Sequence, residues 1–266
     1  MDTGYERKYH QIEEEYWWFQ ARRDIILRFL EKLDRRTPAR REDIGHERRI
    51  LEVGCSGGPL LAELARRGYR HLTGIDISAD AIAEAKACGL TEVSVMDAAN
   101  LTYPDASFDV VIASDILEHL ADDQAALRHW RRVLAPQGIL IVFVPAYQWL
   151  WSGHDVINHH QRRYTAGSLK RVLQGTDAGL ASGGRLEILR LSYWNAGLLA
   201  PVGAMRLLQR LRGDPQHQAK DALTPVPALA NRLLTSWLSF ENWLLAGGLS
   251  YPTGVSVMAM ARKTAS

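Results

Sequence analysis

Two apolar runs, each with an acidic residue near its end, constrain the fold of this chain more than any other feature. The first covers 50–53 and leads into a glycine-rich turn at 54–58, and the second covers 72–76. Residues 60–67 between them have helical character, so the pattern predicts a strand, a tight turn, a helix and a second strand. Free N–H groups at the start of such a helix face a ligand, and Asp76 can accept hydrogen bonds from both hydroxyls of a ribose. This unit therefore predicts a site for a cofactor that contains a nucleoside.

The glycine spacing in the turn shows whether such a cofactor is a dinucleotide. A dinucleotide fingerprint needs glycine at the first, third and sixth positions of the turn. Counted from Gly54, the third and sixth positions hold Ser56 and Pro59. A nicotinamide oxidoreductase on a similar fold is therefore disfavoured.

The motif Glu52-x-Gly54-x-x-x-Gly58, followed by Asp76, resembles the first two motifs of the class I S-adenosylmethionine-dependent methyltransferases. Ser56 is a departure, since glycine is commoner there, and it affects the expected turn conformation more than the cofactor. The segments at 104–120 and 132–145 are also close to the family's sequences.

This resemblance implies S-adenosylmethionine as the cofactor, together with a set of residues that bind it. In the family, an acidic residue like Asp97 contacts the adenine amino group, its neighbour Ala98 contributes backbone, and the segment 114–120 lies beneath the methionine part. The implied cofactor-binding residues are Glu52, Gly54, Cys55, Ser56, Gly58, Asp76, Ile77, Asp97, Ala98 and Ser114.

Strand and helix patterns alternate along the rest of the core. The sequence predicts helices at 78–88, with Ser78 as N-cap, and 124–134, and strands at 93–96, 108–113 and 138–144. This alternation is typical of a doubly wound parallel sheet. The family ends in an antiparallel pair of strands, which 185–191 and 254–261 fit. We therefore expect a Rossmann-like α/β fold with a seven-stranded, mostly parallel sheet, an antiparallel last strand, an N-terminal helix and a helical insertion between the last two strands.

The predicted domain organisation follows these elements. It consists of an N-terminal helical lid and linker at 1–48, a cofactor-binding core at 49–192 with a substrate loop at 145–165, a helical insertion at 193–252, and the final strand of the core at 253–266.

Composition and charge narrow the class of protein. The net charge of +2 gives no electrostatic footprint for nucleic acid, and two cysteines supply neither a disulfide framework nor a thiolate metal site. No apolar run approaches the roughly 18 residues of a membrane span, and the charged N-terminus lacks a signal-peptide core. We therefore expect a cytoplasmic protein that does not bind nucleic acid.

Four consecutive aromatic residues stand in the N-terminal segment, at 16–19. Aliphatic residues from Ile25 onward recur at helical spacing, which predicts an amphipathic helix packed on the sheet. The four aromatics cannot all face one core, so some are expected to cover a pocket, and Trp17 is predicted to contact substrate. In related methyltransferases such a helix often covers the cofactor, and Arg22 or Arg23 would then pair with the cofactor's carboxylate.

A polar and aromatic loop follows the fifth strand and is expected to face the methyl group. Its sequence WSGHDVINHHQRRYT, at 151–165, resembles a subgroup of these methyltransferases in which a His-Asp pair and a His-x-x-Arg-Tyr element occur together. The substrate-binding residues predicted here are Tyr147, Trp151, Asp155, Arg162, Arg163 and Tyr164.

Histidines in and near this loop are candidate general bases, because a neutral imidazole can accept a proton near pH 7. The candidates are His119, in the LEH segment near the presumed methyl group, His154 and His159. Two other interpretations stay open: a hydrogen-bonded loop anchor, and a metal site built from His154, Asp155, His159 and His160. Because the spacing of that set matches no standard metal signature, no metal is predicted.

An insertion of about 60 residues separates the last two strands and contains helical segments at 198–211 and 229–249. A helical pair packed on its own protein, a homodimer contact, an apolar tunnel and a peripheral membrane contact all fit these segments. The sequence thus predicts methyl transfer to a small-molecule acceptor, apolar or lipid-linked, in secondary metabolism or glycan assembly. The alternative from another class is a catalytically inactive methyltransferase-like partner subunit.

Overall fold

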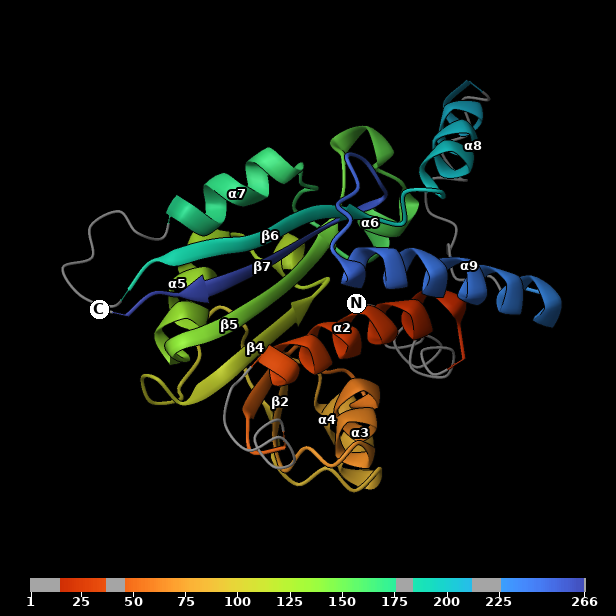
Figure 1. Cartoon of the computed structure of the whole chain (residues 1–266). Helices are drawn as coiled ribbons and strands as arrows, with labels where there is room; N and C mark the ends of the chain where they lie inside the picture. The colour runs from red at the N-terminus through yellow and green to blue at the C-terminus, as the bar shows by residue number, and fades with distance from the viewer. Residues whose placement is uncertain (1–14, 37–45, 176–183, 212–225, 266) are drawn as a thin grey trace.

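The computed structural model describes residues 15–36, 46–175, 184–211 and 226–265, which are arranged around one seven-stranded sheet (Figure 1). The strand order is β3-β2-β1-β4-β5-β7-β6, and β7 runs antiparallel to both of its neighbours. The strands are β1 (Arg49–Val53), β2 (His71–Asp76), β3 (Val93–Val95), β4 (Phe108–Ser114), β5 (Leu134–Pro145), β6 (Leu186–Trp194) and β7 (Ser256–Lys263). The expected Rossmann-like fold class is confirmed. Residues 1–14 and 37–45, which belong to the predicted N-terminal lid and linker at 1–48, lie outside the described residues.

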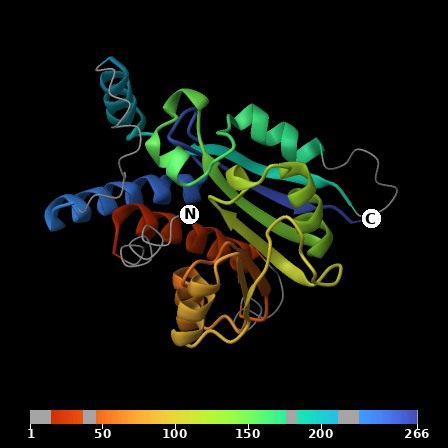
Figure 2. The same cartoon turned by 180° about the vertical axis from the view of Figure 1, so that it is seen from behind.

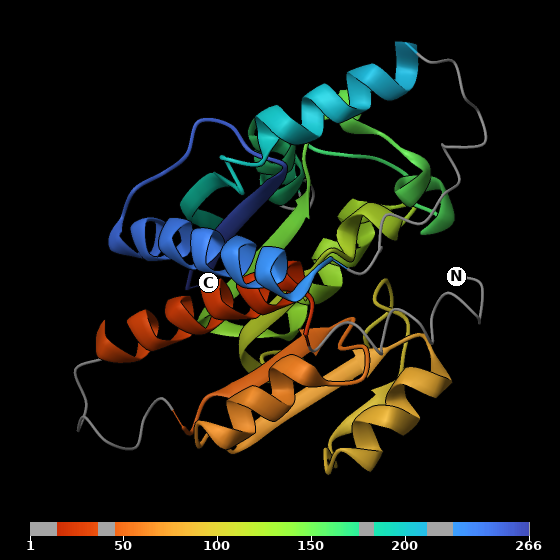
Figure 3. The ribbon, with the colours of Figure 1, turned by 90° about the vertical axis from the view of Figure 1, so that its right-hand side faces the viewer.

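Helices cover both faces of this sheet, so its central strands are apolar and buried. One face shares its core with α2 (Trp17–Arg36), α3 (Pro59–Arg66), α4 (Ala79–Ala87) and α9 (Ala228–Gly247). The other face, seen in Figure 2, packs against α5 (Asp123–Val133) and α7 (Ala166–Gly175). The loop after β5 contains α6 (Gly153–Ile157), and α8 (Leu199–Leu211) projects away from the sheet in Figures 1 and 3.

Side-chain caps fix where two of these helices begin. Ser78 Oγ accepts a hydrogen bond from the Ala81 N–H at 3.2 Å, as predicted, and the Asp122 carboxylate accepts one from the Ala125 N–H at 2.8 Å. The second of these helices, α5, contains the fully buried Trp130, whose Nε1–H donates to the Ala98 carbonyl at 2.8 Å. This bond fixes the segment at the end of β3, where the adenine is expected.

The pairing of β5 with β4 contains a bulge close to residue 138, where the sequence predicted the start of this strand. The pairing of β4 with β5 moves from Phe108–Leu134 to Val110–Ile139, and Gln137 has a φ of 65°. The extra residues on β5 fit into the ladder as an irregularity, so this strand begins earlier than expected.

Helix α9 of the insertion packs on the N-terminal helix α2, and the two lie side by side in Figures 1 and 3. The buried Asn242 of α9 donates through Nδ2 to the Ala21 carbonyl at 2.8 Å and to the Asp24 carboxylate at 2.9 Å, and its Oδ1 accepts from Trp194 Nε1 at 2.7 Å. One side chain therefore connects α9, α2 and β6. Among the described residues, no helix is long and apolar enough to cross a membrane.

Candidate active site

The turn after β1 has the tight conformation that its motif predicts. Gly54 and Gly58 have φ values of 75° and 83°, in a region that side chains rarely adopt. A side chain at Gly54 would also collide with Ile116. Ser56 has a φ of 50°, which costs a residue other than glycine roughly 1–2 kcal/mol. The serine therefore follows the backbone path that glycine would take, at a modest cost in stability.

Hydrogen bonds join this turn to the end of β2. The N–H groups of Gly54 and Cys55 donate to the carbonyl that precedes Asp76, at 2.8 and 2.9 Å. The Asp76 carboxylate accepts from the Ser56 N–H at 3.0 Å through Oδ2 and from the Ser78 N–H at 2.9 Å through Oδ1. These bonds orient the carboxylate, and each oxygen keeps a further lone pair that can accept from a ribose hydroxyl.

A cavity of about 380 Å³ lies at this edge of the sheet, between the turn, the start of α2, the 3-10 helix η1 (Leu117–His119) and the loop after β5. Its volume falls within the range of small-molecule sites. The predicted site residues that line it are Trp17, Arg22, Glu52, Gly54, Ser56, Asp76, Ser114, His119, His154 and Arg163. Segments that are far apart in the sequence therefore meet at one cavity.

The other predicted residues do not line this cavity. Cys55 and Gly58 are buried behind the turn, whereas Ile77 and Asp97 are exposed at the ends of β2 and β3, with Ala98 beside them. The loop residues outside it are Tyr147, Trp151, Asp155, His159, Arg162 and Tyr164. Asp115, Glu118, Asn158 and Arg206 also line it, although none of them was predicted individually as a site residue, and so does His160, which was named only in the metal set that was not predicted. Two of these residues could have been found from their positions in the sequence, because Glu118 and His160 each lie next to a predicted histidine.

Arg22 is a buried cation in the wall of the cavity. Its guanidinium carbon lies 4.1 Å from the ring centroids of both Phe143 and Trp194. Its Nη2 pairs with the Asp115 carboxylate at 3.2 Å and donates to Ser256 Oγ at 3.3 Å. The aromatic faces and the carboxylate stabilise the guanidinium in place of water. The positive charge of α2 can therefore lie in the wall of the cavity.

The loop after β5 is held together by the fully buried Asp155. Its carboxylate accepts hydrogen bonds from the Ser152 N–H at 2.8 Å, from Arg163 Nε and Nη2 at 2.7 and 2.9 Å, and from His160 Nδ1 at 2.9 Å. Burial alone would raise the pKa of Asp155, but the hydrogen bonds from His160 and Arg163 outweigh it and hold that pKa well below its usual range. The carboxylate therefore acts as a loop anchor and does not line the cavity.

Three other predicted substrate residues also contact the protein itself. Tyr164 Oη donates to Asp123 Oδ2 at 2.9 Å, and Arg162 pairs with the same carboxylate at 2.9 Å. Tyr147 stacks on Tyr193 with 5.1 Å between the ring centroids. These contacts fasten the loop to α5 and β6, and they explain why the three side chains do not reach the cavity.

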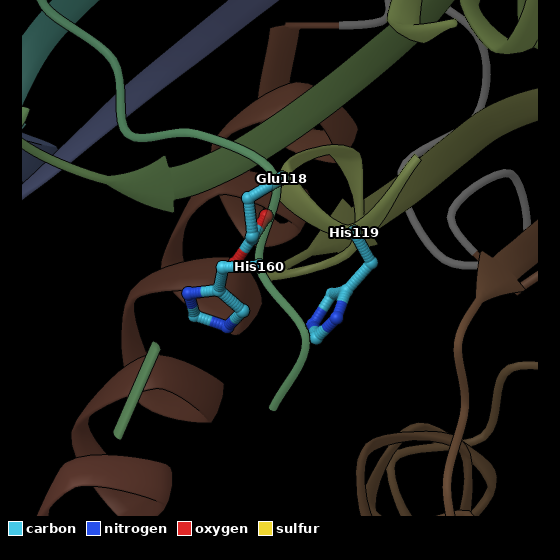
Figure 4. Close-up of side chains that lie close together, drawn as sticks. All are labelled: Glu118, His119 and His160. Atoms are coloured by element: carbon cyan, nitrogen blue, oxygen red, sulfur yellow. The ribbon is translucent and has the colours of Figure 1, made fainter. Parts of the chain in front are cut away.

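A cluster of titratable side chains forms where η1 meets this loop (Figure 4). One ligand atom each of Glu118, His119 and His160 lies within 4.8 Å of the other two. Burial lowers the pKa of His119 and that of His154 to about 4, so both rings are neutral near pH 7. Burial, followed by repulsion from Asp115, raises the pKa of Glu118 well above its usual value. The roles of His119, His154 and the exposed His159 as general bases stay predictions.

Known proteins share both the sequence and the fold of this chain. Residues 51–142 match the methyltransferase domain family. A probable S-adenosylmethionine-dependent methyltransferase of Mycolicibacterium smegmatis is 30% identical over 233 residues, which cover 77% of this chain and 84% of that protein. The ubiquinone biosynthesis O-methyltransferase of Neisseria meningitidis is 28% identical over 151 residues, 53% of this chain and 61% of that protein. An S-adenosylmethionine-dependent methyltransferase from Mesorhizobium loti has a similar fold, with a TM-score of 0.52 and 16% identity over 82% of this chain and 91% of that one.

The fold places a cavity at the carboxyl edge of the sheet, which is where α/β folds of this kind bind their ligands. With the relatives above, the chain belongs to the class I S-adenosylmethionine-dependent methyltransferases. Its cofactor is S-adenosylmethionine, and the nicotinamide alternative is set aside.

Proposed function

We propose that this enzyme transfers the methyl group to a small acceptor with an apolar or lipid-linked part. A second groove, of about 550 Å³ along α8, supports this assignment. It is lined by Trp149, Ala196, Leu199, Ala200, Gly203, Ala204, Arg206, Leu207, Arg210 and Thr253. Because Arg206 lines both the groove and the main cavity, an acceptor can place its reactive group in the cavity and its apolar part along α8.

The cofactor occupies the part of the cavity beside the turn in this proposal. Asp76 holds the ribose hydroxyls, and Gly54 lets the backbone approach the ligand closely. Arg22 offers a two-pronged partner for the cofactor's carboxylate. The ring of Trp18, which lines the cavity, supplies an aromatic face that attracts the positively charged sulfonium.

Methyl transfer requires that the acceptor is aligned with the methyl group, that water is excluded and that one proton is removed from the acceptor. The sulfonium is already a reactive methyl donor, so the acceptor must lie in line behind the methyl carbon. His154 lines the cavity and is our candidate for the group that takes the proton. The name of the Neisseria relative, an O-methyltransferase, supports oxygen as the acceptor atom.

An exposed apolar stripe on α9 supports an acceptor that resides at a lipid surface. Leu229, Leu233, Trp237 and Phe240 recur at helical spacing, and each is more than half exposed. The opposite face of α9 packs on α2, so this stripe is not part of the core. Leucine and aromatic residues on one helix face are typical of contact with a membrane surface.

Methylation of two matched acceptors from tritiated S-adenosylmethionine tests the acceptor class. Dodecylcatechol should have a KM at least about 10-fold lower than methylcatechol, since each buried methylene contributes about 0.8 kcal/mol. Ala200→Glu places a charge in the α8 groove. The KM of dodecylcatechol should then rise to that of methylcatechol, whose own KM should not change. Leu208→Glu, on the same helix but outside the groove, is the control and should behave like the wild type.

Two outcomes would contradict this assignment. Equal KM values for the two acceptors would mean that the groove does not hold the chain. Equal losses in Ala200→Glu and Leu208→Glu would mean that α8 contributes only through its general stability.

A further inference from the structure

Three side chains with metal-binding atoms meet in the main cavity, and two segments of the chain supply them (Figure 4). Glu118 and His119 lie on η1, directly after β4, and His160 follows α6. The backbone N–H of Gln161 donates to the Glu118 carbonyl at 2.7 Å, and Arg162 donates to the Ala121 carbonyl at 2.6 Å. The two segments are therefore fastened together by the protein itself. We propose that Glu118, His119 and His160 form a binding site for a divalent transition-metal ion.

Glu118 is the observation that points to a ligand. Its side chain is completely buried, it lines the cavity, and neither of its carboxylate oxygens has a hydrogen-bond partner from another described residue. The two cations whose charges reach it, Arg22 and Arg163, are each paired with a different carboxylate, Asp115 and Asp155. A buried carboxylate is costly unless it is paired or coordinates a metal. A bound cation would compensate this charge.

The imidazole of His160 is held in the way that metal-ligating histidines usually are. Its Nδ1 lies 2.9 Å from Asp155 Oδ1, and because a carboxylate only accepts, Nδ1 carries the proton of this bond and Nε2 is the nitrogen left to bind a metal. Such a bond fixes the orientation of a histidine that binds metal. The ring of His119 packs edge-on against that of His160, with 4.6 Å between the ring centroids. Asp155 is thus a positioning residue for the site.

The donor set indicates which ions fit. Two imidazoles and one carboxylate suit zinc, cobalt or iron in the divalent state, and three protein ligands leave coordination positions open. Ligand atoms around a tetrahedral zinc ion lie roughly 3.4 Å apart, so the side chains, now within 4.8 Å, must move inward slightly. This site differs from the set His154, Asp155, His159 and His160 considered from the sequence, because Asp155 is the loop anchor and His159 is exposed.

The role of the ion rests on the proposed function. An acceptor hydroxyl coordinated at an open position would lose its proton more readily, to His154 or to water. Its oxygen would then form a bond to the methyl carbon while the carbon–sulfur bond breaks, and the electron pair of that bond would stay on sulfur. The products are the methyl ether and S-adenosylhomocysteine. His119 then serves as a ligand instead of a base.

Titration of the full, tag-free chain with Co²⁺, without cofactor or acceptor, tests the site. We expect visible d–d absorption that saturates at one ion per chain. Glu118→Gln and His160→Gln should each weaken Co²⁺ binding by at least about 100-fold, because each removes a direct ligand. His159→Gln, at the exposed neighbour, is the matched control and should bind like the wild type. Glu118→Gln keeps the size of the side chain and cannot become charged, so its melting temperature should not fall.

Absence of Co²⁺ binding by the wild type, or unchanged binding by Glu118→Gln, would overturn the site. Binding of S-adenosylhomocysteine, measured separately by calorimetry on the same preparation, reports on the cofactor site alone. A metal site that fails while this binding persists leaves the proposed methyl transfer standing. If Co²⁺ binds but S-adenosylhomocysteine does not, the metal site stands and its proposed role in methyl transfer is contradicted.

Discussion

Asp76→Ala is expected to weaken the binding of S-adenosylhomocysteine by more than about 100-fold. The carboxylate is held by the N–H groups of Ser56 and Ser78 at the end of β2, where it can accept from both ribose hydroxyls. Each hydrogen bond to a charged group contributes roughly 1.5–3 kcal/mol, so two of them amount to about 3 kcal/mol or more. Isothermal titration calorimetry measures this change directly.

Asp80→Ala is the matched control for that experiment. Asp80 is an exposed carboxylate in the first turn of α4, close to Asp76 in the sequence but outside the cavity. Its removal should leave the affinity for S-adenosylhomocysteine within about twofold of the wild type, since it affects only the helix terminus by about 0.3–1 kcal/mol. If Asp76→Ala also bound normally, the nucleoside would have to lie elsewhere.

Arg22→Met should lower the free energy of unfolding by roughly 1.5–3 kcal/mol, because it removes a buried cation and its hydrogen bonds, while Asp115, whose side chain is 33% exposed, keeps some contact with water. The guanidinium lies between Phe143 and Trp194 and pairs with Asp115. Methionine fills much of the same volume but leaves this carboxylate without its cation. Urea denaturation followed by circular dichroism measures the loss.

Two further variants separate the ion pair from simple packing. Arg28→Met removes a pair with Asp24 one turn away on the same helix, in which the side chains are 32% and 29% exposed, and its effect should stay within about 0.5 kcal/mol. The double variant Arg22→Met with Asp115→Asn should recover part of the stability, because no unpaired charge remains. An Arg22→Met protein as stable as Arg28→Met would show that the pair contributes nothing.

Local sequence patterns were sufficient to predict the sheet and the cofactor turn. Buried strands, a glycine turn and an N-cap at Ser78 all depend on residues that are neighbours in the chain, so their signals can be read directly. The bulge at Gln137 was missed because it depends on how β5 pairs with β4. The contacts of Arg22 with Phe143 and Trp194 were not predicted, because these two residues come from distant strands.

The loop after β5 shows the limit of this reasoning. Its residue types were correctly recognised as unusual, but the type of a side chain does not say whether it faces a ligand or another part of the protein. Asp155 contacts Arg163 and His160 within the loop, whereas Tyr164 reaches Asp123 on α5. The meeting of Glu118 with His160 depends on the path of the chain between them, and no local pattern encodes it.

Hydrogen exchange of the backbone amides, with and without S-adenosylhomocysteine, tests most directly whether the cavity at the carboxyl edge is the cofactor site. We predict slower exchange at 54–60, 76–79, 97–99 and 114–120, and at 16–23 on α2, with no change when NADH is added instead. Protection confined to α8 and α9, or protection by NADH at the turn after β1, would contradict the account.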